Sequence, residues 1–201
     1  MITRLEAPPE PPADLGSRTP LEIVVEVGES LHRFYSRAYL PVHFDRSFEG
    51  RLNAHDGSYG VLYVAAGREG AFAETFLRSP GRTLLPIDLV RAKASIVLKT
   101  TRALRLARLA GPGLGRIGAT AQVVHGGKPY VTSQAWSGAL YAHPGGFDGI
   151  AYYARHDDEA LCYAIFDRAR DALVEEDRLL ELDEDWFWDL AEIYGVGLAP
   201  D

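Results

Sequence analysis

Short apolar runs, separated by polar and Gly-rich turns, recur along most of the chain. Their length and their aliphatic and aromatic content predict β-strands. These runs lie at residues 61–65, 83–87, 95–98, 104–109, 149–153 and 161–166. Longer segments predict helices at residues 68–78, 133–141 and 185–194. Since strands and helices do not alternate regularly, the pattern predicts an α+β fold with small mixed or antiparallel sheets and flanking helices.

The first 22 residues differ from the rest of the chain. Four prolines fall between positions 8 and 12, and a Pro-rich polar composition favours an extended segment over a packed element. We therefore expect residues 1–22 to form an arm that is mobile or docked on a partner. Residues 23–201 show no internal repeat and no linker, and we expect them to form a single domain that ends in an aromatic-rich helix.

The composition narrows the class of protein. A chain of 201 residues with 47% hydrophobic positions suits one compact domain with an ordinary core. The formal net charge of -7 disfavours nucleic acid as a partner, because the surface as a whole repels a polyanion. The single Cys162 rules out a disulfide or a thiolate zinc cluster within one chain and favours a reducing cytoplasm. No stretch reads as a signal core or a membrane span, so neither export nor membrane insertion is expected.

Two patterns in the chain are weak evidence for a dinucleotide-binding site or a metal site. Residues 113–118 form a G-x-G-x-x-G sequence, but a dinucleotide-binding fold would place an acidic residue about 20 positions later. The first acidic residue after Gly118 is Asp148, so we interpret the glycines as a flexible connection. The histidines at positions 32, 43, 55, 125, 143 and 156 are scattered. They form no H-E-x-x-H motif and no i, i+4 pair, so no metal site is expected.

A series of short motifs is more specific. It comprises His32-Arg33-Phe34, Gly50-Arg51-Leu52-Asn53, Tyr59-Gly60-Val61-Leu62-Tyr63-Val64-Ala65 and Ala71-Phe72-Ala73-Glu74-Thr75-Phe76. Further along are Asp148-Gly149-Ile150-Ala151-Tyr152, Arg155-His156-Asp157 and Ala164-Ile165-Phe166-Asp167. In order and spacing, these motifs resemble those of the RES domain family, named for Arg, Glu and Ser. The resemblance spans about residues 31–167.

The resemblance implies a compact fold similar to ADP-ribosyltransferases and NAD as the substrate. It predicts an NAD phosphorylase or glycohydrolase that cleaves the nicotinamide–ribose bond, with inorganic phosphate as a candidate co-substrate. It also implies a cytoplasmic toxin whose partner is an Xre-type helix-turn-helix antitoxin. The alternatives are a mono-ADP-ribosyltransferase that modifies a protein and a non-catalytic nucleotide-binding or interaction module. Whether the chain forms a homo-oligomer stays open.

Glu74 is the candidate catalytic carboxylate. Cleavage of the bond between nicotinamide and ribose develops positive charge on the sugar, and a carboxylate held against the ring stabilises that charge. From residue types alone, the commoner role would be a surface carboxylate paired with Arg78, four positions later. The similarity of the surrounding A-F-A-E-T-F segment to the family favours the catalytic role.

Arg33 and Arg51 are the candidate phosphate-binding residues, with Arg33 also assigned to the catalytic group. The planar guanidinium of Arg matches phosphate oxygens with two charge-assisted hydrogen bonds. The resemblance places both at Arg positions of the family, although Arg37 and Arg46 are of the same type. Tyr63 lies on a predicted strand, where its ring could stack on nicotinamide or form part of the core.

The serine of the family name has no single counterpart. Thr132, Ser133 and Ser137 stand near the start of a predicted helix, where a hydroxyl and free backbone N–H groups can meet a phosphate or a ribose. We take Ser133 as a substrate-binding candidate, with a plain helix cap as the alternative. Ala154 stands where many relatives have Ser. His55, in a turn near the predicted pocket, is a second substrate-binding candidate or an ordinary loop residue.

The C-terminal helix carries large aromatic residues among acidic ones. Trp186, Leu190 and Ile193 share a predicted face that would pack onto the domain. Phe187 and Trp188 could instead anchor a contact with a second subunit or an antitoxin. Packing onto the domain is the commoner outcome for such residues.

Overall fold

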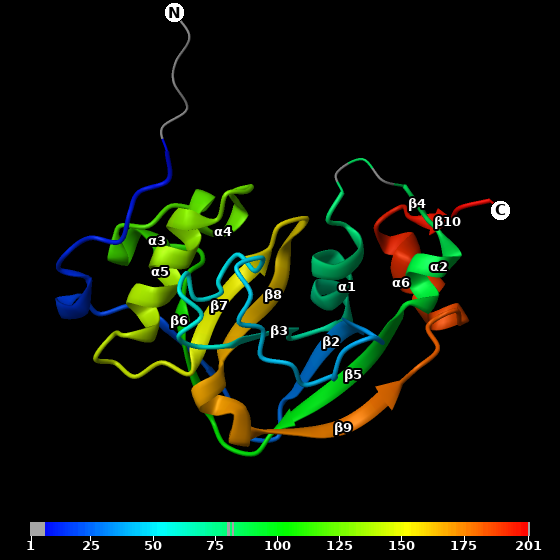
Figure 1. Cartoon of the computed structure of the whole chain (residues 1–201), viewed down its shortest axis with the longest axis horizontal. Helices are drawn as coiled ribbons and strands as arrows, with labels where there is room; N and C mark the ends of the chain where they lie inside the picture. Colours follow the sequence, from blue (N-terminus) through cyan, green and yellow to red (C-terminus); the bar gives the residue numbers. More distant parts are fainter. Residues whose placement is uncertain (1–6, 80, 82, 201) are drawn as a thin grey trace, which may run out of the picture.

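A curved mixed sheet of eight strands forms the centre of the molecule (Figure 1). The structure is a computed structural model that describes residues 7–79, 81 and 83–200. The strand order is β1-β6-β7-β8-β3-β2-β5-β9. The strands are β1 (Glu22–Val25), β2 (Ser30–Ser36), β3 (Val61–Ala65), β5 (Lys93–Thr100), β6 (Leu104–Arg108), β7 (Gly149–Ala154), β8 (Asp157–Phe166) and β9 (Leu173–Leu179). Neighbouring strands run antiparallel except β6 and β7, which are parallel.

Helices flank the sheet in two groups, with α3, α4 and α5 on the left of Figure 1 and α1, α2 and α6 on the right. The helices are α1 (Arg68–Phe76), α2 (Ile87–Arg91), α3 (Pro112–Ile117), α4 (Gln122–His125), α5 (Val131–Tyr141) and α6 (Asp185–Ile193), with 3-10 turns η1 (Leu15–Ser17) and η2 (Asp167–Ala172). A second, parallel sheet pairs β4 (Leu84–Leu85) with β10 (Gly197–Leu198). The α+β prediction is thereby confirmed. No helix among the described residues is long and apolar enough to cross a bilayer.

The predicted elements are present, with shifted ends. The six predicted strands correspond to β3, β4, β5, β6, β7 and β8, and the three predicted helices correspond to α1, α5 and α6. The strands absent from the predicted set are β1, β2, β9 and β10. β1 and β9 are edge strands, β9 has mostly exposed side chains, and β2 mixes apolar residues with His32 and Arg33. β2 and β9 therefore lack the apolar content on which the prediction depends, whereas β1 is apolar but only four residues long and β10 has only two residues.

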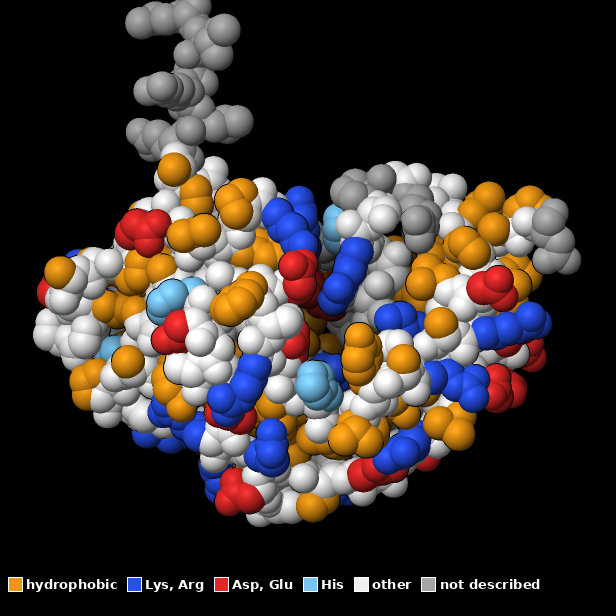
Figure 2. Space-filling model, in the orientation of Figure 1, with side chains coloured by type: hydrophobic (Ala, Val, Ile, Leu, Met, Phe, Trp, Pro, Cys, Tyr) orange, Lys and Arg blue, Asp and Glu red, His pale blue; other side chains and the backbone are white. Residues whose placement is uncertain are grey.

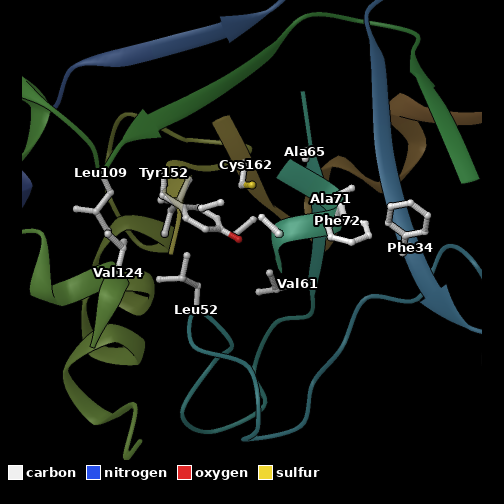
Figure 3. Close-up of a cluster of buried hydrophobic side chains, with 14 of the residues drawn as sticks. Phe34, Leu52, Val61, Ala65, Ala71, Phe72, Leu109, Val124, Tyr152 and Cys162 are labelled. Atoms are coloured by element: carbon white, nitrogen blue, oxygen red, sulfur yellow. The ribbon is translucent and has the colours of Figure 1, made fainter. Parts of the chain in front are cut away.

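The sheet carries a hydrophobic cluster on each face, because side chains alternate along every strand. On β3, Val61 and Ala65 belong to the cluster under the helices, whereas Leu62 and Val64 belong to the cluster on the opposite face. Figure 3 shows part of the helix-side cluster, from Phe34 and Phe72 at one end to Leu109 and Val124 at the other. The candidate catalytic groups therefore lie beside the largely apolar, close-packed helix side of the sheet.

Helix α1 lies across β2, β3, β7 and β8. Gly70 allows this close approach, since a Cβ atom there would lie 3.0 Å from the Cβ of Ala65 and 3.1 Å from the Sγ of Cys162. Phe72, on the buried side of the same helix, is fully enclosed and stacks on Tyr194 at the end of α6. The helix that carries Glu74 is thus fixed directly onto the strands.

Helix α6 packs onto α1 through a different face from the one predicted. Phe187, Leu190 and Ala191 are buried, at the i, i+3, i+4 spacing of one helical face. Ile193, which was expected on that face, is 66% exposed, and Trp186 is half-buried. The alternative in which Phe187 anchors a partner is also wrong, because its side chain is fully buried within the chain.

The G-x-G-x-x-G segment is a short helix, and the expectation of a flexible connection is wrong. Gly113 lies inside α3, where a Cβ atom would come within 2.2 Å of the Arg108 carbonyl oxygen. Gly118 ends the helix in the left-handed conformation, with φ of 82°. The glycines therefore serve a tight strand-to-helix connection.

The described part of the N-terminal arm packs onto the domain, which differs from the mobile or partner-bound arm that we expected. Leu15 is 4% exposed and belongs to the helix-side cluster. The indole Nε1 of Trp136 donates to the Pro9 carbonyl oxygen at 2.7 Å, and Arg18 donates to the Ile117 carbonyl oxygen at 2.8 Å. A buried indole N–H requires an acceptor, and the extended arm supplies it. Residues 1–6 of the predicted arm lie outside the described residues.

The buried position of Leu15 gives a direct test of this packing. Leu15→Ala is expected to lower the free energy of unfolding by about 2–4 kcal/mol, because it leaves a cavity in the helix-side cluster. Urea denaturation measures the change, with the exposed Ile193→Ala as the control, for which less than about 0.5 kcal/mol is expected. Equal stability of Leu15→Ala and the wild type would show that the arm does not pack.

Candidate active site

A cleft of about 880 Å³ opens on the helix side of β2 and β3. These two strands pair through His32 and Ala65 alone. Further along, β3 pairs instead with Asp45, which forms an isolated bridge to Val61. The strands therefore diverge, and residues from both line the cleft together with α1 and the segment that precedes β3. Figure 2 shows the hollow in the middle of this face, with Lys, Arg and His side chains around it.

The cleft brings together four of the six site residues predicted from the sequence. Arg33, Arg51, Tyr63 and Glu74 all line it. They come from β2, the segment between β2 and β3, β3 itself and α1. Residues separated by up to 41 positions in the chain therefore share one concave surface.

Glu74 lies on the cleft side of α1, and its carboxylate does not pair with Arg78. Arg78 donates from Nε to the backbone oxygen of Glu74 at 2.7 Å. The carboxylate accepts instead from the backbone N–H of Arg155 at 3.1 Å and from the hydroxyl of Tyr152 at 3.4 Å. These contacts come from the end of β7 and the turn that follows it, so they hold the carboxylate at a fixed place in the cleft.

Arg33 fills the gap where β2 and β3 separate. Its guanidinium donates to the Tyr63 carbonyl oxygen at 2.8 Å, while its buried Nε has no hydrogen-bond partner among the described residues. Burial, followed by repulsion from Arg78, lowers the pKa of Arg33 to about 10. The group stays protonated at neutral pH, and its residue lines the cleft.

Arg51 and Tyr63 are connected through the turn that contains Asn53. The Tyr63 hydroxyl accepts from the Leu52 backbone N–H at 2.8 Å and donates to Oδ1 of Asn53 at 3.0 Å. Burial raises the pKa of Tyr63, so the hydroxyl is neutral. Arg51, held by this turn, has a buried Nε without a described partner, and its guanidinium carbon lies 5.7 Å from the centre of the Tyr130 ring.

The remaining two predicted site residues lie outside the cleft lining. Ser133 is buried in α5 and donates its hydroxyl to the Val123 carbonyl oxygen. His55 is exposed in the turn before β3. Ala154 is fully buried at the end of β7. None of these three positions supplies a hydroxyl or imidazole to the cleft.

Sequence reasoning missed several groups that the cleft contains. Tyr152, Arg155, His156, Arg78 and Lys93 all line it. The first three belong to motifs that were quoted for the family resemblance, so that resemblance could have placed them near Glu74. The last two belong to no motif, and their sequence neighbours do not distinguish them from solvated surface charges.

The cleft concentrates positive charge that is not neutralised. Its cations are Arg33, Arg51, Arg78, Lys93 and Arg155, and none forms an ion pair with a described carboxylate. Its carboxylates are Asp45, Glu49 and Glu74, of which Glu49 pairs with Lys128 outside the cleft lining. Such a surface favours an anionic ligand, and Glu74 supplies a negative group for a positively charged part of that ligand. Within the described ranges there is no cluster of His, Cys, Asp and Glu that could hold a metal ion.

Comparisons with known proteins agree with this picture of the fold. The model of a family described as "RES domain" matches residues 30–189. The solved structure of the M. tuberculosis MbcT-MbcA toxin-antitoxin complex is similar, with a TM-score of 0.63 and 14% sequence identity over 84% of this chain and 92% of that chain. At this level of identity the likeness shows a common fold. A comparison with curated proteins gives no match.

The Tyr63 hydroxyl is expected to stabilise the turn that presents Arg51. Tyr63→Phe leaves the Leu52 N–H and the Asn53 amide oxygen without their partner, which costs about 1–3 kcal/mol of unfolding free energy. Tyr35→Phe is the matched control, because Tyr35 is also buried in the sheet and its hydroxyl has no described partner. Urea denaturation of both variants gives the difference, and equal losses would contradict a specific role for the Tyr63 hydroxyl.

Proposed function

The chain belongs to the RES domain family, and on that premise we propose that it is an enzyme that cleaves the bond between nicotinamide and ribose in NAD. One observation carries the proposal. The carboxylate of Glu74 and the guanidinium groups of Arg33 and Arg51 line the same cleft. A reaction that needs a negative group at a sugar and positive groups at a pyrophosphate therefore finds both on one surface.

The negative charge of Glu74 stabilises the transition state. As the bond to nicotinamide breaks, positive charge develops on the ribose, and a fixed carboxylate beside the ring favours that state over the ground state. Tyr152 and the N–H of Arg155 hold the carboxylate, so little reorganisation is needed as the charge appears. Nicotinamide leaves as a neutral base with the bonding electron pair.

Arg33 and Arg51 bind the phosphates of the dinucleotide. Each has a buried Nε with no described partner, and a buried donor of this kind is costly unless a ligand accepts from it. The cleft volume of about 880 Å³ lies in the range of small-molecule sites. The ring of Tyr63 offers an aromatic face to the nicotinamide, since its hydroxyl is already engaged by the 52–53 turn.

The acceptor of the ADP-ribosyl group is water or inorganic phosphate in this proposal. Transfer to a protein side chain remains the alternative activity, and product analysis separates the three. The proposed assignments do not include Ser133 or His55, because neither lines the cleft.

We further propose that the protein acts in the cytoplasm as a toxin and that a small antitoxin protein inhibits it. The similar solved structure is a toxin–antitoxin complex. Large apolar side chains on this chain also gather near the cleft: Tyr39, Leu40, Phe48 and Val131 are between 63% and 75% exposed. Tyr39 lines the cleft, and Phe48 and Val131 each adjoin a lining residue. Exposed apolar residues around a charged pocket favour a protein partner that covers it.

Glu74→Gln tests the reaction. Purified protein is incubated with NAD, with and without phosphate, and nicotinamide, ADP-ribose and its phosphate ester are followed. The substitution is expected to lower kcat by about 10²–10³-fold, as for the loss of one electrostatic group at a developing charge. Glu69→Gln, at an exposed position on the same helix outside the cleft lining, is expected to keep wild-type turnover. Unchanged nicotinamide release by Glu74→Gln would remove this carboxylate from the mechanism.

Expression in bacterial cells tests the toxin. The wild-type chain is expected to arrest growth and to deplete NAD, whereas Glu74→Gln at the same protein level is expected to do neither. Co-expression of the protein encoded beside this chain is expected to restore growth. Growth arrest by both forms, without loss of NAD, would contradict the proposed activity as its cause.

A further inference from the structure

The turn that supports Glu74 joins β7 to β8. It consists of Arg155 and His156, and the backbone N–H of Arg155 donates to Oε1 of Glu74 at 3.1 Å. Both residues of the turn also line the cleft. The position of this turn therefore determines where the Glu74 carboxylate is held relative to a substrate.

The turn lacks the geometry that usually stabilises a tight hairpin. Two-residue hairpin turns most often adopt types with positive φ angles, because these match the twist of the flanking strands. No described residue other than glycine has a positive φ, so this turn is of another type. Ala154 pairs with Asp157 across it, but the next pair is Tyr153 with Leu161, so residues 158–160 bulge out of β8. Contacts beyond the strand ladder therefore contribute to holding the turn.

Asp157 supplies such contacts. Its Oδ1 accepts from the backbone N–H groups of Glu159 and Ala160, at 3.1 and 3.2 Å, and so holds the bulge. Its Oδ2 accepts from the Tyr194 hydroxyl at 2.7 Å. Burial, together with the bond to Asp157 and its charge, raises the pKa of Tyr194, so the hydroxyl stays protonated and donates. One end of the hairpin is thus tied to a residue far away in the chain.

Tyr194 also contacts the helix that carries Glu74. It stands at the end of α6, beyond the residues that the family model matches, and α6 lies beside α1 (Figure 1). Its ring stacks on Phe72, with the ring centroids 5.4 Å apart and the planes 7° from parallel. Helix α1 in turn packs on the bulge, since a Cβ atom at Gly70 would lie 3.4 Å from the Cβ of Ala160. One side chain therefore contacts both elements on which the position of the Glu74 carboxylate depends.

We propose that Tyr194 is a positioning residue, which holds the β7–β8 turn through Asp157 and thereby places the carboxylate of Glu74. The inference rests on the proposed function for its role in turnover. Tyr194 does not line the cleft, so it acts through Glu74 and not on the substrate. Loss of its hydroxyl is expected to weaken stabilisation of the transition state and to leave the groups that bind NAD in place.

Tyr194→Phe removes the hydroxyl and keeps the ring that stacks on Phe72. Its kcat for nicotinamide release is expected to fall about tenfold, because a displaced carboxylate stabilises the developing charge less well, while the KM for NAD changes by less than about twofold. Tyr163→Phe is the matched control, for which wild-type kcat is expected. Tyr163 is buried on β8 in the cluster on the opposite face of the sheet, and its hydroxyl has no described partner. Thermal unfolding shows that each variant is folded at the assay temperature.

A double-mutant cycle with Glu74→Gln separates positioning of the carboxylate from a general effect on the fold. If Tyr194 acts through Glu74, Tyr194→Phe lowers kcat about tenfold in the wild-type background and by less than about twofold in the Glu74→Gln background. Equal factors in the two backgrounds would overturn the inference. An unchanged kcat of the single variant Tyr194→Phe would overturn it as well.

Amide hydrogen exchange tests the same link without turnover. The amide hydrogens of Arg155, Glu159 and Ala160 are expected to exchange about tenfold faster in Tyr194→Phe than in the wild type, as for the loss of a hydrogen bond to a charged group. The same amides are expected to keep wild-type exchange in Tyr163→Phe. Failure of the wild type to cleave NAD would defeat the proposed function, and exchange then decides whether Tyr194 holds the turn. Unchanged exchange in Tyr194→Phe would contradict the inference in either case.

Discussion

A hydrogen bond from the Arg33 guanidinium to the Tyr63 carbonyl oxygen stands where the ladder between β2 and β3 would otherwise continue. If β2 and β3 were paired along their whole length, no cleft would open between them. The side chains of a continuous sheet would instead pack against the helices that cover it. Here the strands separate after one pair of residues, and a backbone acceptor that would have no strand partner is satisfied by a charged side chain. The Arg33 side chain thus takes the place of a strand partner for Tyr63. This completes the backbone hydrogen bonding, leaves the cleft open and places a cation in it.

The unpaired charges of the cleft destabilise the folded state. Elsewhere in the described residues, eight of the fourteen Lys and Arg side chains form ion pairs with carboxylates, whereas none of the five cations of the cleft does. Four buried side-chain nitrogens also lack described partners, and three of them, Nε of Arg33 and Arg51 and Nε2 of His156, belong to residues that line the cleft, the fourth being Nε of Arg108. Close-packed interiors rarely leave such groups unsatisfied. Their concentration in one cavity is accounted for by a ligand more readily than by stability.

Much of the fold could be predicted from the sequence, because the central strands β3, β7 and β8 are strongly apolar and α1, α5 and α6 have clear helical patterns. Ile193 shows the limit of such reasoning, since helical periodicity gives a face but not which of two overlapping faces meets the neighbouring helix. The polar strand β2 escaped prediction for a related reason. Its Arg33 forms a tertiary interaction with β3, and the residues around Arg33 in the sequence do not reveal that partner.

The candidate site, like the fold, was predicted from the sequence only in part. Glu74, Arg33, Arg51 and Tyr63 lie within motifs whose order resembles a family, and these four line the cleft. Ser133 was chosen for its residue type near a helix start, but in the structure its hydroxyl serves a buried carbonyl oxygen of the neighbouring helix α4. Arg78 and Lys93 could not be separated from other surface charges, because what distinguishes them is their position in the cleft, which exists only in three dimensions.

The net charge of the molecule is negative and the cleft is positively charged, and these two charges affect different classes of ligand. With a formal net charge of -7, the surface repels an extended polyanion, whose many phosphates meet the acidic exterior. A small anion can instead enter the cleft, where low-dielectric walls strengthen its attraction to the unpaired guanidinium groups. The long-range field and the local site thus favour a compact phosphorylated molecule over a nucleic acid. The carboxylate of Glu74, placed among the cations, further favours a compact anion that also carries or develops positive charge.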